Sequence, residues 1–231
     1  MNQAPLQIVA LGRGKTGSLV IEVARERGHR VHMLAASDNA NGAWLTADNL
    51  RHADVVIDFT SPHGVQANIE AVVNAGKAMV VGTTGWYEQL DRVKKLVEDR
   101  GTGFVFGANF SYGVNLLFQI VKVAAPALTH GYIGHITETH HIHKKDAPSG
   151  TAVALQKILN QAADIEVPIT SEREGDVTGA HTLELSATGD RIMLTHEAKS
   201  RRTFAEGAVL AAEWIVHKRG FYDFKDIFSQ L

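Results

Sequence analysis

The chain has 231 residues, which is enough for one large domain or two small ones. Its formal net charge of -2 creates no general attraction to nucleic acid or to an anionic membrane, and its 45% hydrophobic and 21% charged residues are ordinary for a globular protein. The absence of cysteine excludes disulfides, thiolate metal sites and a cysteine nucleophile, and it fits a reducing cytoplasm.

Targeting and membrane segments are not expected. The N-terminal stretch MNQAPLQIVALG has no basic segment followed by a long apolar run, so we expect no signal peptide. No stretch approaches the 18 apolar residues or more of a membrane-spanning helix. We therefore expect a cytoplasmic protein whose partner is a small molecule rather than a nucleic acid or a membrane.

The segment LGRGKTG (residues 11–17) is compatible with two kinds of nucleotide site. Its GKT run resembles the end of a P-loop, which binds nucleoside triphosphates. In the P-loop motif G-x-x-x-x-G-K-[ST], however, the first glycine would fall at residue 9, where valine stands. The P-loop interpretation therefore fails at the position where the backbone most needs glycine.

The same segment matches the dinucleotide-binding motif G-x-G-x-x-G in full, at Gly12, Gly14 and Gly17. Residues 6–37 around it show the pattern strand, turn, helix, strand that this motif requires. There Gly12 permits the tight turn, Gly14 lets the backbone approach a pyrophosphate, and Gly17 lets the helix pack on the strand. We therefore expect NADH or NADPH at this helix N-terminus, the alternative being a glycine-rich turn without a ligand.

Two charged residues near this turn bear on the cofactor. Lys15 adds a positive charge beside the expected phosphates. Asp38, just past the second strand, stands where an acidic residue would hold the adenosine ribose, but it is equally an ordinary turn carboxylate in SDNANG. The sequence therefore leaves the choice between NADH and NADPH open.

The first half of the chain alternates strands with helices. We predict strands over 6–11, 30–37, 53–62, 78–86 and 103–111, and helices over 17–29, 63–77 and 87–101. This order indicates a Rossmann-like, doubly wound parallel sheet, which binds ligands beyond the carboxyl ends of its strands. Thr60-Ser61, Thr83-Thr84 and Asn109 follow three of these strands and are candidates to bind the nicotinamide and its ribose, with simple turn chemistry as the alternative.

The second half predicts a smaller α+β domain with a mixed or antiparallel sheet. We predict helices over 113–130, from near 151 and over 203–220, a strand over 132–141, two hairpin strands within 179–201, and a mobile polar loop over 171–180. Because helix 203–220 is expected to return to the first domain, we assign residues 1–107 and 203–231 to the dinucleotide-binding domain. Residues 108–202 then form a substrate-binding and oligomerisation domain.

A cationic turn lies between the predicted strand 132–141 and the next helix. The turn contains His140, His141, His143, Lys144, Lys145 and Asp146. The Gly150 and Thr151 amides at the helix N-terminus, with Lys144 and His141, suit a small carboxylate substrate, and His140 and Lys144 are candidate proton donors. Ser149 is a suitable N-cap for that helix.

The same turn could instead be a metal site or a solvated turn without a function. Histidines at successive and alternate strand positions point to opposite faces, and no H-E-x-x-H spacing is present, so we expect no metal. A solvated His/Lys turn without a function is the other alternative. The direct continuation of the turn into a glycine-opened helix favours a binding site instead.

The stretch ETHHIHKKDAPSGTA (138–152) closely resembles the 4-hydroxy-tetrahydrodipicolinate reductase (dihydrodipicolinate reductase) family, of the diaminopimelate route to lysine. It meets every fixed position of the pattern E-x-H-H-x-x-K-x-D-A-P-S-G-T-A. GRGKTG, VIDFTSP, VVGTTGW, GANFSYGVN, GDVTGAHT and SRRTFAEGA extend the resemblance over nearly the whole chain. The chain is shorter than many members, chiefly after the second strand and around 165–175.

The resemblance implies roles for individual residues. His140 would be the catalytic acid/base and Lys144 the proton donor, while His141, Gly150 and Thr151 would bind the substrate carboxylates. The candidate cofactor-binding residues are Gly12, Arg13, Gly14, Lys15, Thr16, Gly17, Asp38, Thr60, Gly82, Thr83, Thr84, Gly107, Ala108, Asn109 and Phe110. The resemblance also implies a cytoplasmic homotetramer assembled through the sheet of the second domain.

The expected reaction is the NAD(P)H-dependent reduction of 4-hydroxy-tetrahydrodipicolinate to tetrahydrodipicolinate, with the nicotinamide facing the His140 turn. Two alternatives stay open at this point. One is another two-domain nicotinamide enzyme, such as an aspartate dehydrogenase. The other is a non-catalytic dinucleotide sensor, which would need the glycine turn but not the His/Lys turn.

Overall fold

The computed structural model describes residues 4–231, which divide into two compact units. Unit 1 comprises the described residues up to Ser111 together with Arg201–Leu231, and unit 2 comprises Tyr112–Ser200. The sequence-based division places the same two boundaries after residue 107 and before residue 203. The assignment of substrate binding and oligomerisation to the second unit stays a prediction.

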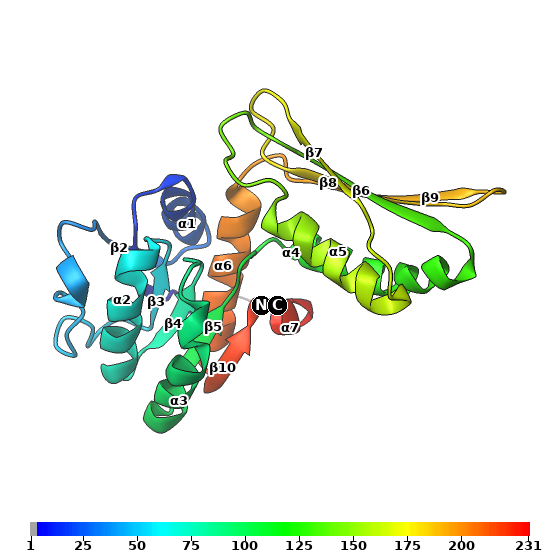
Figure 1. The fold of residues 1–231 in the computed structure, drawn as a ribbon. Helices are drawn as coiled ribbons and strands as arrows, with labels where there is room; N and C mark the ends of the chain where they lie inside the picture. The colour runs from blue at the N-terminus through cyan, green and yellow to red at the C-terminus, as the bar shows by residue number, and fades with distance from the viewer. Residues whose placement is uncertain (1–3) are drawn as a thin grey trace. The chain divides into compact units, whose positions relative to one another are not determined.

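Unit 1 is built on a six-stranded, all-parallel sheet, which confirms the predicted Rossmann-like class (Figure 1). In sheet order its strands are β10 (Gly220–Asp223), β5 (Gly103–Phe106), β4 (Ala78–Val81), β3 (Val55–Asp58), β1 (Gln7–Leu11) and β2 (Arg30–Leu34). The edge strand β10 was not predicted. The strand order reverses between β1 and β3, and ligands of such sheets bind at this kind of reversal.

Helices cover both faces of this sheet and form two cores. The α1 (Lys15–Glu26), α6 (Arg202–Ile215) and α7 (Phe224–Ile227) helices pack on one face, and α2 (Pro62–Asn74) and α3 (Leu90–Arg100) pack on the other. Successive side chains of a strand point to opposite faces, so Val55 and Ile57 contact the first core and Val56 contacts the second. The continuous apolar runs in the sequence follow from this two-sided burial.

Unit 2 is a four-stranded mixed sheet with helices on one face (Figure 1). Its strands in sheet order are β7 (Ile169–Arg173), β6 (Ile133–His140), β8 (Ala180–Ser186) and β9 (Arg191–Glu197), and its helical segments are α4 (Tyr112–Ala124), a 3-10 segment (Ala125–His130) and α5 (Gly150–Ala163). Alternate residues Ile136, Glu138 and His140 of β6 are buried, because they share one strand face. Two of these three inward-facing residues are ionisable, so this face of β6 does more than pack the core.

The predicted mobile loop over 171–180 is wrong at its start. Residues 171–173 belong to β7, which pairs in parallel with β6. Glu174 N–H then donates to the carbonyl of His140 at 2.8 Å, and Ile142 N–H donates to the carbonyl of Gly175 at 3.2 Å. This segment therefore fixes the backbone of the His/Lys turn. Its polarity reflects an edge strand exposed to solvent, which composition does not distinguish from a loop.

The expectation that no segment is long and apolar enough to cross a membrane is also wrong on those two criteria. In the part of the chain that the structure describes, Tyr112–His130 passes with a mean hydropathy of 1.2. This segment comprises α4 and the 3-10 segment after it. Leu117, Val121 and Ala125 of the same segment pack into the core of unit 2, and a core helix meets the same two criteria.

Candidate active site

The glycine turn of unit 1 has the sterics expected of a dinucleotide-binding turn. Gly12 has φ +103°, and a Cβ there would lie 2.3 Å from the Phe59 carbonyl oxygen. A Cβ on Gly17 would lie 2.4 Å from the carbonyl oxygen of Gly12. Since nothing larger than hydrogen fits at either position, the turn and the close packing of α1 both require glycine.

Gly14 differs, because a Cβ there would meet nothing within 4 Å. It is the N-cap of α1, so the first-turn N–H groups of that helix have no intrahelical partner. Beside it lies a cleft of about 270 Å³. The cleft is lined by Gly14, Lys15, Thr16, Gly17, Phe59, Thr60, Pro62, Gly82, Thr83 and Thr84. The structure thus brings the ends of β1, β3 and β4 together in a space that fits a phosphate-bearing cofactor.

A buried carboxylate that the sequence analysis did not single out organises the floor of this cleft. Asp58 is fully buried, and its Oδ1 accepts hydrogen bonds from the Thr60 N–H at 2.9 Å, the Thr60 hydroxyl at 2.7 Å and the Thr83 hydroxyl at 2.7 Å. Its Oδ2 accepts from the Asn68 amide at 2.7 Å. Asp58 therefore holds Thr60 and Thr83, two of the predicted cofactor residues, in fixed positions.

The remaining predicted cofactor residues do not line this cleft. Asp38 is exposed and bonded within its own turn, to Ala35 N–H at 3.1 Å and the Ser37 hydroxyl at 3.1 Å, so its ribose role stays a prediction. Phe110 is a core residue, 4.6 Å from the Phe224 ring between centroids. The others outside the cleft lining are Gly12, Arg13, Gly107, Ala108 and Asn109.

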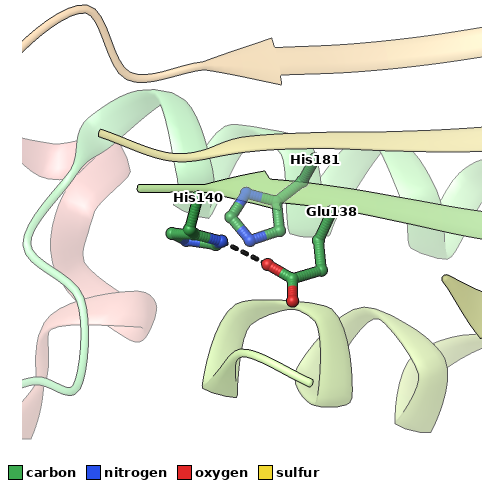
Figure 2. Close-up of side chains that lie close together, drawn as sticks. All are labelled: Glu138, His140 and His181. Carbon is green, nitrogen blue, oxygen red and sulfur yellow. Dashed lines mark hydrogen bonds and ion pairs between the residues drawn. The ribbon is translucent and has the colours of Figure 1, made fainter. Parts of the chain in front are cut away.

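The His/Lys turn of unit 2 is anchored by a buried charged network (Figure 2). Glu138 and His140, both on β6, are joined through Glu138 Oε2 and His140 Nδ1. The other carboxylate oxygen, Oε1, accepts from Arg173 of β7 at 3.0 Å. Glu138 is fully buried and His140 is 8% exposed. One carboxylate thus connects the predicted catalytic histidine to a guanidinium on the neighbouring strand.

The predicted proton donor Lys144 belongs to the same turn. Its Nζ donates to Asp146 at 2.6 and 2.7 Å, and the guanidinium of Arg173 donates to the Asp146 carbonyl at 2.7 Å. The Lys144 side chain is 20% exposed, so it is partly shielded but still reachable from solvent. The ion pair with Asp146 orients the ammonium.

His181 of β8 connects this network to the N-terminus of α5. Its ring lies 5.2 Å from the His140 ring, edge to face, and its Nε2 lies 3.0 Å from the Ser149 hydroxyl. Ser149 caps α5 as predicted, accepting from Ala152 N–H at 3.2 Å. Gly150 and Thr151 open the helix next to this cap. The predicted substrate-binding amides therefore follow directly on the His-rich network.

Burial and nearby charges shift the pKa values of these groups. Burial lowers the pKa of His140; the Glu138 carboxylate opposes this, and Lys144 and Arg173 add to it. Burial lowers the pKa of His181 to about 4, and the neighbouring His140 adds to the shift. Burial raises the pKa of Glu138, but hydrogen bonds from Ser171, Arg173 and His140 outweigh it, so the net pKa is lowered. Glu138 is therefore anionic and His181 neutral at neutral pH.

Ligand atoms of Glu138, His140 and His181 lie within 4.8 Å of one another, a spacing that would also suit a metal ion. Both Glu138 oxygens are already engaged, one by His140 and the other by the cationic Arg173. A cation placed here would face that guanidinium and would have to compete with His140 and Arg173 for the Glu138 oxygens. The set fits a hydrogen-bond network better than a cation site.

Sequence reasoning missed four residues, Asp58 in the cleft of unit 1 and Glu138, Arg173 and His181 in the network of unit 2, and of these Glu138 alone left a readable signal. Glu138 lies two positions before His140 on an alternating strand, so the two side chains share a face. Arg173, His181 and Asp58 gave no such signal, because their roles depend on strand pairing or on buried partners from other elements.

Comparison with protein families matches both parts of the chain. Residues 6–110 match the N-terminal part of dihydrodipicolinate reductase, and residues 113–228 match its C-terminal part.

Individual relatives give the same result. The chain is 35% identical over 240 residues to the 4-hydroxy-tetrahydrodipicolinate reductase of Christiangramia forsetii, covering 98% of this chain and 99% of that protein. It is 36% identical over 262 residues to the enzyme of the same name from Chromobacterium violaceum, covering 95% and 97%. Dipicolinate-bound dihydrodipicolinate reductase from Paenisporosarcina sp. TG-14 has a similar fold, with a TM-score of 0.80, 21% identity, and coverage of 96% and 99%.

Proposed function

The chain belongs to the dihydrodipicolinate reductase family, and from this we infer that it reduces 4-hydroxy-tetrahydrodipicolinate to tetrahydrodipicolinate with NADH or NADPH, a step of lysine biosynthesis. The observation that carries this proposal is the pairing of a full family match with the network around His140 and Lys144. The reaction class is hydride transfer to a cyclic, conjugated imine dicarboxylate.

The glycine turn of unit 1 has what a dinucleotide requires. The open space at Gly14 admits a pyrophosphate close to the backbone. The N–H groups in the first turn of α1 carry partial positive charge and would face that pyrophosphate. Thr60 and Thr83, fixed by Asp58, offer hydroxyl groups at neighbouring strand ends. When bound, the reduced nicotinamide supplies the hydride.

The His/Lys turn of unit 2 supplies charge and protons. After loss of water from the substrate, a hydride adds to a ring carbon conjugated to the C=N bond and one proton completes the reduction. Lys144 donates that proton, and His140 is the acid/base that exchanges a proton with the substrate while water leaves, taking it from the ring carbon and returning it to the departing hydroxide. His141, Lys144 and the amides of Gly150 and Thr151 hold the substrate carboxylates through positive charge and the dipole of α5.

The direct test follows the absorbance of NADH and of NADPH with substrate freshly made by the preceding synthase. We expect oxidation of the cofactor only when the cyclic imine is present. Consumption with aspartate or other amino-acid substrates instead would favour the two-domain dehydrogenase alternative. Binding of NAD(P)H without any consumption would favour the dinucleotide sensor.

We also propose that the enzyme is a cytoplasmic homotetramer, as its family resemblance implies. The face of the unit 2 sheet opposite its helices carries exposed apolar side chains, among them Ile133 of β6 and Met193 of β9. Such residues are typical of a surface that another copy of the chain covers. Light scattering after size exclusion measures the assembly, and a monomer at micromolar concentration would contradict it.

A further inference from the structure

We propose that Glu138 is a positioning residue that fixes the hydrogen of His140 on Nδ1, so that His140 exchanges its proton with the substrate through Nε2. This inference rests on the proposed function and deepens it. It assigns the working atom of the predicted acid/base and names the group that selects it.

The hydrogen-bonding chemistry of a carboxylate supports this assignment. An ionised carboxylate can only accept, so the Nδ1 that contacts Glu138 Oε2 must carry hydrogen. Neutral His140 then has its lone pair on Nε2, and protonated His140 has its exchangeable N–H there. The fully buried Glu138 stays ionised because Arg173 donates to its other oxygen at 3.0 Å.

The surroundings of Nε2 are consistent with a working atom. A Cβ added at residue 179 would lie 2.9 Å from His140 Nε2, which is closer than a Cβ approaches a neighbouring atom, so any side chain larger than that of glycine would crowd this nitrogen. The edge of the neutral His181 ring packs against His140 at 5.2 Å and limits its rotation. Nδ1 of the imidazole is thus bonded to Glu138, and Nε2 lies beside a glycine where a methyl group would overlap it.

The ionisable groups that face His140 come from three strands and the turn. They are Glu138 on β6, Arg173 on β7, His181 on β8, and Lys144 and Asp146 in the turn. Glu138 and Asp146 are the anions among them, and only Glu138 bonds the imidazole. Removing its charge should therefore lower the pKa of His140, because Lys144 and Arg173 then act on it without the bonded anion.

The decisive variant is Glu138→Gln. If the new amide oxygen keeps the bond from Arg173, its NH2 group faces Nδ1 and forces the hydrogen of His140 onto Nε2. We expect kcat to fall about tenfold or more with an unchanged KM for the cofactor, and the pH limb governed by His140 to move about one unit lower. Glu138→Asp keeps the charge and should retain part of the activity.

Two matched controls separate this role from a general change at the sheet. Glu172→Gln neutralises an exposed carboxylate on β7 that accepts from the Thr139 hydroxyl at 3.0 Å, and it should leave kcat unchanged. Gly179→Ala should lower kcat by crowding Nε2. Gly131→Ala, which also places alanine at a positive φ (+86°) but where a Cβ meets nothing within 4 Å, should not.

Nitrogen-15 NMR of histidine-labelled wild-type protein tests the tautomer without relying on activity. We expect a protonated Nδ1 and an unprotonated Nε2 for neutral His140. A hydrogen on Nε2 of neutral His140 in the wild type, with none on Nδ1, overturns the proposal, even if Glu138→Gln fails to fold. So does a folded Glu138→Gln variant with wild-type kcat and pH profile. If the wild type does not consume NAD(P)H with the imine, the proposed function fails, while the NMR result still decides the role of Glu138.

Discussion

The two units each carry a predicted ligand site at a turn before a helix, but different interactions shape the two turns. In each, a strand ends, a short turn follows and a helix begins at a predicted ligand site: Gly14 precedes α1 in unit 1, and Ser149 precedes α5 in unit 2. The turn of unit 1 is shaped by backbone sterics, since a Cβ at Gly12 or Gly17 would overlap a carbonyl oxygen. The turn of unit 2 is shaped by side chains, through Glu138 and its charged partners.

This difference shows how each site can be disrupted. A single methyl group added at Gly12 or Gly17 should break the first turn, because the atoms that it would overlap belong to the backbone and not to a flexible side chain. A change of charge or of hydrogen-bond direction should disable the second turn while its fold survives. The substitutions below test this contrast, beginning with the largest expected effect.

Gly12→Ala should destabilise unit 1 strongly. The new Cβ would lie 2.3 Å from the Phe59 carbonyl oxygen at φ +103°, so we expect the free energy of unfolding to fall by about 3 kcal/mol or more. Gly14→Ala is the matched control, since its Cβ meets no protein atom within 4 Å. It should keep most of the stability and instead raise the KM for the cofactor. Denaturant unfolding and steady-state kinetics measure both, and equal stability losses would contradict the steric account.

Lys144→Ala should abolish most turnover without weakening cofactor binding. A positioned proton donor is worth about a hundredfold or more in rate, and the cofactor-binding turn belongs to the other unit. Lys145→Ala removes the adjacent, exposed lysine and should behave like the wild type. Comparable kcat values for the two variants would remove Lys144 from the proposed chemistry.

Asp58→Asn should both destabilise unit 1 and weaken the cofactor site. The amide cannot accept at both positions, so one of the donors from Thr60, Thr83 or Asn68 loses its partner, at a cost of about 2 kcal/mol. The KM for the cofactor should rise with it. Asp54→Asn changes an exposed carboxylate bonded to the Gln7 N–H at 2.7 Å and is the control. A melting temperature equal to that of the control would argue against the buried network.

His181 should make stability depend on pH. Its pKa is lowered from 6.5 to about 4 by burial. Between these two pH values the unfolded chain therefore binds a proton at His181 and the folded protein does not. The contribution of neutral His181 to stability is fully present above about pH 6.5 and is lost as the pH falls toward 4. The free energy of unfolding should therefore fall by at most about 2 kcal/mol between pH 7 and pH 5. His181→Gln should flatten this dependence and the exposed His52→Gln should not, as unfolding curves at several pH values would show. An unchanged slope in His181→Gln would contradict the assigned burial.

The sequence predicted most of unit 1 because its signals are local. The alternation of apolar strands with helices and the spacing of three glycines determine the parallel sheet and its turn, and the structure confirms both. The strands β7 and β10 were missed, because both are short edge strands whose identity depends on pairing with β6 and β5. Pairing of this kind is a tertiary effect that local propensity does not contain.

The site in unit 2 was predictable only in part for the same reason. His140, Lys144, Gly150 and Thr151 lie in one stretch and were identified together. His181 faces Glu138 only through the antiparallel register of β6 and β8, which the sequence does not reveal. Glu138 itself could have been predicted as a partner of His140, because residues two positions apart on a strand share one face.

The central claim is that this chain delivers a hydride to the conjugated ring of the cyclic imine. The most direct measurement supplies NADPH or NADH deuterated at the hydride-donating carbon of its nicotinamide and analyses the product by mass spectrometry and NMR. The account predicts one deuterium on the ring carbon that accepted the hydride, which was conjugated to the C=N bond in the dehydrated substrate. An unlabelled product, or no product with either cofactor, would contradict it.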